Sequence, residues 1–484
     1  MSQQTSFKSD YIKMGIVLLF MFGFRLLPPI GSITPYGMAV LGILIGAILG
    51  WSFDGKCMTQ TSLLALVALA TTAYPGGVNA ISNALLGNAS LLIMCLAMIL
   101  AGALVEAGMD NYLIAKVMNI PFAKGKPWVI TFLLVFSPYV LSIFITNTAL
   151  ILFLLPTYAK LLRGAGYQAG DKYVMHVLIG ACLSAVASMY IFPFKGMALA
   201  YSGMVQAYIG TIWTYAEYMM TATVFSAVLA AGYTLFMRLI RCDASKMADV
   251  DLSVFGDSNM KATKHQKGVL AGMVMYIVGA TIISFGSMID SPVTNFLGKI
   301  GVYGWLFAIL AVMMIVRVDG KRLMDINSAT RKGFSWELIL LVGSATVVGG
   351  ALTSAESGFG TFLSGLIAPV LGGLGSFALA VVMCVVVLLA TNFCNNMAIM
   401  MIAFSLIGSL AAGGMEMNSV MMIIGAMIFS QIGFLLPASS LWGAILHTAD
   451  MATPSAVIKN VILTLIYCIV VAVIVFVPLC EIVF

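Results

Sequence analysis

The chain has 484 residues, of which 61% are apolar and 9% are charged, and its formal net charge is +6. Since an ordinary soluble domain is roughly a quarter charged, this composition excludes a water-soluble globular fold. A bilayer core ~30 Å thick requires about 20 apolar residues per helical crossing. Stretches of this kind recur from Tyr11 to the C-terminus. We therefore expect an all-α membrane protein, with basic loops that set its topology and do not bind nucleic acid.

Taken in chain order, the apolar segments predict about eleven transmembrane helices. The expected crossings are residues 11–27, 35–51, 61–76, 89–109, 173–205, 213–238, 268–288, 301–318, 334–355, 417–447 and 455–482. Two further apolar stretches, 110–162 and 356–415, are too long for loops, and each has two apolar arms around a polar point. We expect each to form a re-entrant hairpin, which enters and leaves the membrane on the same side.

The distribution of basic residues supports this topology. With a cytoplasmic N-terminus and two uncrossing hairpins, all but Arg25, Lys195 and Lys299 of the 24 Lys and Arg residues fall on the cytoplasmic side. Such a bias is what the positive-inside rule describes. We expect a multi-pass protein of the inner or plasma membrane, with its N-terminus in the cytoplasm and its C-terminus outside.

The two halves of the chain carry short matching motifs at a nearly constant spacing. The matches are Gly102-Ala103-Leu104 with Gly350-Ala351-Leu352, Asn147-Thr148-Ala149 with Asn396-Met397-Ala398, and Ser142 with Thr391. The order of the segments also matches, whereas their predicted directions are opposite. This combination indicates an inverted-topology repeat.

Polar clusters lie inside both hairpins, where an amide or hydroxyl without a partner costs several kcal/mol. The first cluster is Ser142 with Thr146-Asn147-Thr148, and the second runs from Thr391 to Met397. A helix that breaks at each tip exposes N–H groups at one half-helix and carbonyl groups at the other. An anion and a cation can then be held side by side. The alternative is that these side chains only cap helix breaks or join helices.

At these residues the sequence resembles the divalent anion:sodium symporter (DASS) family of the ion-transporter superfamily. That family has a Ser-Asn-Thr motif at the tip of each hairpin. The first tip here reads Thr146-Asn147-Thr148, and the second reads Asn395-Asn396-Met397. Ser142 stands where the family has a sodium-ligating serine, and Thr391 keeps the upstream hydroxyl of the second tip. The resemblance extends to the runs Trp336–Gly343 and Phe434–Pro437, and marks a divergent member.

This resemblance implies an elevator-type secondary transporter that forms a homodimer. It implies four parts: scaffold helices (1–88), a first transport repeat (89–212), scaffold helices with basic cytoplasmic loops (213–333), and a second transport repeat with the last helix (334–484). The candidate substrate-binding residues are Thr146, Asn147, Thr148, Lys195, Asn395, Asn396, Met397 and Ser439. The candidate ligands of a coupling Na⁺ are Ser142, Thr146, Asn147, Thr391 and Asn396.

Lys195 is a departure from the family pattern. The family's fifth and tenth crossings are broken helices that complete the sodium sites. In the fifth crossing here, Pro193 and Gly196 favour a break, and Lys195 lies between them. An intramembrane ammonium costs at least ~2.5 kcal/mol, so it is expected to face a cavity or a negative partner. Three roles are compatible with this position: Lys195 replaces a sodium ion, binds a substrate carboxylate, or snorkels outward.

Met397 is a second departure, and it bears on the substrate. A dicarboxylate favours hydrogen-bond donors from both tips, whereas this side of the second tip is apolar. The difference points to a monoanion or to a substrate with an apolar end. The alternative is that Met397 only packs, and that the donors are Asn392, Asn395, Ser439 or Ser440.

The leading hypothesis is therefore a sodium-coupled symporter of a small carboxylate-type anion, and not an enzyme. The rival within transport is a cation-independent exchanger in which Lys195 supplies the missing positive charge. An intramembrane enzyme is a remote alternative, because Ser142, Cys394 and His447 have no triad-like spacing. A channel is another, and currents above ~10⁶ ions per second would indicate one.

Overall fold

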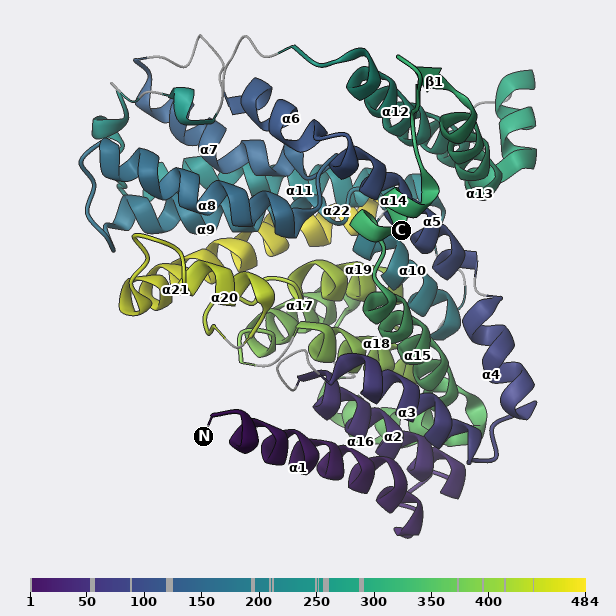
Figure 1. Ribbon diagram of the computed structural model, residues 1–484. Helices are drawn as coiled ribbons and strands as arrows, with labels where there is room; N and C mark the ends of the chain where they lie inside the picture. The colour runs from purple at the N-terminus through teal and green to yellow at the C-terminus, as the bar shows by residue number, and fades with distance from the viewer. Residues whose placement is uncertain are drawn as a thin grey trace.

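The computed structural model describes residues 2–52, 57–87, 89–118, 125–192, 196–208, 210, 213–248, 250, 252–255, 261–286, 291–371, 374–393, 396–412, 415–437 and 439–484. Lys195 and Asn395 lie outside these ranges, and so does the side chain of Met397. Within them the chain is mostly helical, as expected (Figure 1). Its two short strands, β1 (Arg317–Val318) and β2 (Lys321–Arg322), pair antiparallel.

The helices of the first half are α1 (Ser2–Gly23), α2 (Pro35–Ser52), α3 (Met58–Ala70), α4 (Gly77–Leu86), α5 (Ala89–Glu106), α6 (Met109–Met118), α7 (Pro127–Leu141), α8 (Asn147–Gly164), α9 (Lys172–Ser188), α10 (Gly196–Tyr208) and α11 (Tyr215–Leu239). Those of the second half are α12 (Lys264–Phe285), α13 (Pro292–Ile315), α14 (Ile326–Gly333), α15 (Trp336–Thr353), α16 (Phe359–Leu371), α17 (Ser376–Ala390), α18 (Asn396–Ala412), α19 (Ser419–Phe429), α20 (Leu441–His447), α21 (Pro454–Val471) and α22 (Val477–Val483). Short 3₁₀ turns are η1 (Phe24–Leu26), η3 (Ser245–Met247), η4 (Leu252–Phe255) and η6 (Ala355–Ser357), and the π turn η7 (Ala472–Phe476) joins α21 to α22.

Several helices are long and apolar enough to cross a membrane. In the described ranges these are α11, α12, α13, α15 and the continuous run Pro454–Val483. The pair α5–α6, bent by 74°, makes a sixth span if it is counted as one. Shorter apolar helices, such as α7, α9, α17 and α19, accompany them. The chain is thus a multi-pass membrane protein, while the count of about eleven crossings stays a prediction.

The fifth and tenth crossings are divided, as the family pattern implied, whereas the third and eighth end earlier than expected. The fifth is divided, since α9 ends at Ser188 and α10 begins at Gly196. The tenth is divided too, with α19 ending at Phe429 and α20 beginning at Leu441. The third ends early, at Ala70, and farther along the chain Gly76 and Gly77, with φ of 79° and 59°, turn it into α4.

The eighth expected crossing also ends early, because a β-hairpin follows α13. Asp319 and Gly320 have φ of 51° and 79°, which is the geometry of a two-residue hairpin turn. Asp325 then caps α14 by accepting a hydrogen bond from the Ser328 N–H at 2.9 Å. Hydrogen bonds from the backbone of Ser328 hold the pKa of the Asp325 carboxyl below its usual value.

Each segment expected as a two-armed hairpin contains one more helix than predicted. α6 precedes the arms α7 and α8, and α16 precedes the arms α17 and α18. The arms meet at short breaks, residues 142–146 and 391–395, which we call the first and second tips. Their expected re-entrant position in the membrane stays a prediction.

Helix packing surrounds the first tip with elements from both halves of the chain. α9 packs against α7, α8 and α11, and α7, α8 and α9 lie together at the left of Figure 1. α15 packs against α2, α3 and α10, while α14 packs against α5. A Cβ added to Gly102 would clash with the carbonyl of Ala329, and one added to Gly333 with that of Met98. Glycine therefore lets α5 and α14 approach backbone to backbone.

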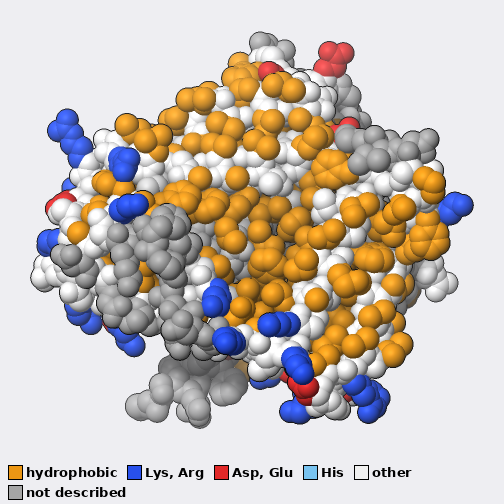
Figure 2. Space-filling model, turned by 90° about the horizontal axis from the view of Figure 1, so that it is seen from above, with side chains coloured by type: hydrophobic (Ala, Val, Ile, Leu, Met, Phe, Trp, Pro, Cys, Tyr) orange, Lys and Arg blue, Asp and Glu red, His pale blue; other side chains and the backbone are white. Residues whose placement is uncertain are grey.

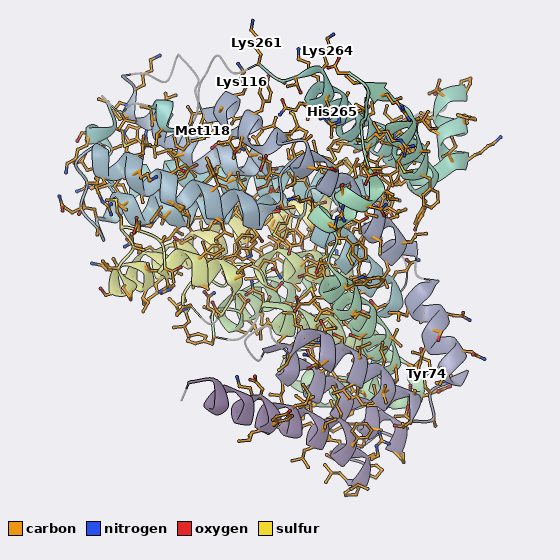
Figure 3. The ribbon with its side chains drawn as sticks, viewed as in Figure 1. Tyr74, Lys116, Met118, Lys261, Lys264 and His265 are labelled. Carbon is orange, nitrogen blue, oxygen red and sulfur yellow. The ribbon has the colours of Figure 1, made fainter. Side chains whose placement is uncertain are left out.

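The outer surface is apolar over wide areas. Figure 2 shows apolar side chains across the face seen from above, with Lys and Arg toward its left and lower edges. Exposed residues of α11 and α12 include Val228, Leu235, Val274 and Val278. Such a face is expected where helices contact lipid. Figure 3 shows basic side chains along the upper edge of its view, namely Lys116, Lys261, Lys264 and His265.

Candidate functional site

A cavity of about 260 Å³ lies at the first tip. Every residue from Ser142 to Thr148 lines it. The wall is completed by Ser188 at the end of α9, by Met189 and Phe192 after it, and by Met94, Ala97, Met98, Ala101, Gly333, Leu338 and Trp442. The cavity thus joins the tip to α5, to the start of α15 and to α20. None of the described residues that line it carries a charge.

The first tip forms because α7 ends and α8 begins only a few residues later. Ser142 closes α7 through its N–H, which donates to the Pro138 carbonyl at 3.0 Å. Thr146 is extended (φ −67°, ψ 132°) and starts α8, but its side chain does not cap the helix. The first N–H groups of α8 therefore keep the partial positive charge of a helix N-terminus. An anion is favoured at such a position.

Ser142 has a buried hydroxyl group without a partner. The residue is 5% exposed, and its Oγ makes no hydrogen bond to the described part of the chain. Leaving a buried hydroxyl unpaired costs about 1–3 kcal/mol. Ser142 also lines the cavity, so this buried hydroxyl lies in the wall beside the space for a ligand.

Asn147 ties the first tip to the end of α9. Its Nδ2 donates to the Ala185 carbonyl, and Ser188 Oγ lies 3.5 Å from the same nitrogen. Within the described residues its Oδ1 accepts no hydrogen bond. Because the side chain also lines the cavity, this oxygen is available to a ligand. Thr146 is exposed and Thr148 half-buried on the same wall.

The second tip has a similar plan but its polar side chains are enclosed. Asn396 begins α18 as Asn147 begins α8, and its Nδ2 donates to the Gln431 carbonyl at 3.2 Å. Thr391 Oγ1 lies 2.8 Å from Asn396 Oδ1 and is also in contact with the Ser430 carbonyl. Thr391 is 0% exposed and Asn396 is 5% exposed. Neither residue lines the cavity at the first tip.

The Asn392 side chain joins the second tip to the segment after α19 by hydrogen bonds, a role that the sequence did not reveal. Its Oδ1 accepts from the N–H groups of Phe434 at 3.0 Å and Leu435 at 2.9 Å. Its Nδ2 donates to the carbonyls of Leu388 at 2.7 Å and Ile432 at 3.0 Å. The amide has thus used both donors and both acceptor positions. Asn392 is 0% exposed and fixes the break between α19 and α20.

The serines after this break are also engaged with the backbone. Ser439 Oγ contacts the carbonyls of Gly433 at 2.9 Å and Leu436 at 2.6 Å. Ser440 Oγ contacts the Gly433 carbonyl and accepts from the Gly443 N–H at 2.8 Å, which caps α20. α20 in turn brings Trp442 to the cavity wall. Sequence reasoning missed Trp442, because a single aromatic residue beside a serine pair carries no spacing signal.

Of the candidate residues, the structure brings Ser142, Thr146, Asn147 and Thr148 together around one cavity. The other candidates that it describes are Thr391, Asn396 and Ser439, which lie at the second tip and at the neighbouring break between α19 and α20. Lys195, Asn395 and the side chain of Met397 lie outside the described residues. The roles assigned to all these residues stay predictions.

No protein-family model matches the chain. An uncharacterized transporter of Methanocaldococcus jannaschii is 22% identical over 347 residues, which cover 72% of each protein. The crystal structure of the YdaH transporter of Alcanivorax borkumensis aligns with a TM-score of 0.55 and 14% identity, over 81% of this chain and 86% of that one. MtrF of Neisseria gonorrhoeae, described with a class of antimetabolite efflux pumps, aligns with a TM-score of 0.58 and 13% identity, over 96% of each chain. At these identities the two solved structures show a shared fold.

Proposed function

We propose that this membrane protein is a secondary active transporter of a small carboxylate-type anion, coupled to Na⁺. The observation that carries the proposal is the cavity at the first tip, where the uncapped start of α8 lies near the Ser142 hydroxyl, which has no hydrogen-bond partner among the described residues. The relative and the two solved structures of this fold carry names of transporters, which supports transport over catalysis or conduction.

The proposed anion site uses the backbone of α8 and the hydroxyl groups beside it. N–H groups at a helix start donate to an anion, and the helix dipole favours negative charge there. The Ser142 hydroxyl, which has no other partner in the described chain, supplies a further donor. Since no charged side chain of the described wall competes, recognition depends on these neutral groups.

The proposed Na⁺ sites use oxygen atoms at both tips. Hard cations prefer carbonyl, amide and hydroxyl oxygens. At the first tip, Asn147 Oδ1 and Ser142 Oγ are such atoms. At the second, Thr391 Oγ1 lies against both Asn396 Oδ1 and the Ser430 carbonyl. A hydroxyl has one proton, so it cannot satisfy both acceptors, and this oxygen-rich group fits a cation.

The proposed elevator mechanism is supported by the likeness of the two tips. Pro127 begins α7 and Ser376 begins α17, at the spacing that separates Asn147 from Asn396. In both cases the Asn bonds to the chain at the end of a third helix, α9 or α19. Inverted repeats of this kind let one body alternate between two sides of a membrane. A homodimer with fixed scaffold helices belongs to the same proposal.

A thermal-shift experiment on the detergent-purified protein tests the coupling. Stabilisation by a ligand at 100 times its Kd is about 2.7 kcal/mol, which shifts the melting temperature measurably. We expect carboxylates to stabilise the protein in NaCl and much less in KCl. Equal stabilisation in both salts would favour the cation-independent exchanger, in which Lys195 replaces Na⁺. A panel of mono- and dicarboxylates that causes no shift in either salt would contradict the proposal.

A further inference from the structure

The cavity wall is polar on the tip side and apolar elsewhere. Its polar side chains come from the first tip and from Ser188. α5 contributes Met94, Ala97, Met98 and Ala101, whose spacing of three and four residues is that of a single helix face. Leu338 and Trp442 extend the apolar wall. A ligand that fills this cavity therefore meets hydrogen-bond donors in one region and only apolar side chains in the rest.

The described wall offers one site for a negative group, at the first tip. The start of α8 supplies roughly half a positive charge, and the hydroxyl groups of Ser142, Thr146 and Thr148 lie on the same side of the wall. No described residue of the second tip lines the cavity, and the Asn392 amide makes four hydrogen bonds at the break between α19 and α20. A second carboxylate in the cavity would be desolvated against apolar side chains without a partner, which is strongly unfavourable.

The apolar region suits a compact hydrophobic group. The volume of about 260 Å³ is below the roughly 300–1,000 Å³ of typical ligand pockets, so the ligand is small. Trp442 is 5% exposed and offers a large, stiff apolar surface. Met94 and Met98 can adapt their unbranched side chains to irregular shapes.

From this division of the wall we infer that the substrate is a monocarboxylate with an apolar body, its carboxylate at the start of α8 and its body against α5 and Trp442. The inference rests on the proposed function, since it names the substrate class of the same site. It follows from side chains of the described wall and does not depend on Met397. It also separates this chain from the dicarboxylate transporters that its tip motifs resemble.

Three six-carbon ligands test the inference: hexanoate, adipate and hexanamide. They share one chain length and carry one, two and no negative charges. Binding to the purified full-length protein in NaCl is measured by calorimetry. We expect hexanoate to bind at least about tenfold more tightly than either analogue. Tighter binding of adipate would overturn the inference and leave the proposed anion transporter standing. If no carboxylate binds, the proposed function itself fails; if hexanamide equals hexanoate, the anion site at α8 is wrong.

Trp442→Ala tests the apolar wall by a gain of binding. The variant enlarges the cavity, so decanoate should gain at least about tenfold relative to hexanoate. Mere structural damage would weaken both ligands alike. The matched control is Trp128→Ala, which removes a Trp that does not line the cavity and should leave the ratio unchanged. If Trp442→Ala does not fold, Trp442→Phe is expected to shift the ratio in the same direction by less. An unchanged ratio in a folded variant would contradict the placement of the apolar body.

Discussion

Replacing Asn392 by alanine should destabilise the break between α19 and α20. The change removes the acceptor of the buried Phe434 N–H and of the partly buried Leu435 N–H, and a donor to the Ile432 carbonyl. A buried backbone group left unpaired costs about 1–3 kcal/mol, so the two N–H groups alone predict a loss of about 2–6 kcal/mol. Water that enters the space would bring the loss toward the lower end of this range.

Thermal melting of the purified variant and hydrogen exchange of residues 430–437 measure this effect. We expect a lower melting temperature and faster exchange of the Phe434 and Leu435 amides, with no change in α7. Asn83→Ala is the control, because Asn83 is exposed on α4. A variant that melts like the wild type, and in which both amides exchange as slowly as in the wild type, would refute this role of Asn392.

Three further predictions concern the tips and the topology. Asn147→Ala or Asn396→Ala should abolish uptake while folded protein stays in the membrane, and uptake above half of wild type in either would remove that residue from the site. Ser142→Ala should raise the free energy of unfolding by about 1 kcal/mol while weakening ligand-induced stabilisation, because it removes an unpaired buried hydroxyl; lower stability would mean that the hydroxyl has a structural partner. A cysteine at Val78 should react with an impermeant maleimide added outside intact cells, whereas one at Val254 should not; the reverse pattern would invert the topology.

The sequence was informative where one chemical constraint acts locally. Composition alone predicted a helical membrane protein, because lipid cannot satisfy an exposed backbone. The repeated motif predicted a common role for Asn147 and Asn396, and each is the first residue of the second arm of its hairpin. The Asp319-Gly320 pair is a hairpin signal, but we predicted no hairpin after the apolar run 301–318.

The sequence could not predict which tip has its polar side chains enclosed and hydrogen-bonded and which has them on a cavity wall. Three of the four partners of Asn392, namely Ile432, Phe434 and Leu435, are 40, 42 and 43 residues away in the sequence, so no local pattern distinguishes it from Asn396. Trp442 likewise reaches the cavity only because α19 and α20 are separated by a break. Tertiary packing decides which polar groups have partners. The first tip is identified as the candidate site because its Ser142 hydroxyl has none among the described residues.

The most direct test of the central claim is uptake into proteoliposomes that contain the purified protein. Labelled hexanoate is supplied outside, with an inward gradient of NaCl in one sample and of KCl in the other. The account predicts accumulation above the outside concentration only with the Na⁺ gradient, and its collapse when a sodium ionophore dissipates that gradient. Equal uptake in both salts, unaffected by the ionophore, would contradict sodium-coupled transport.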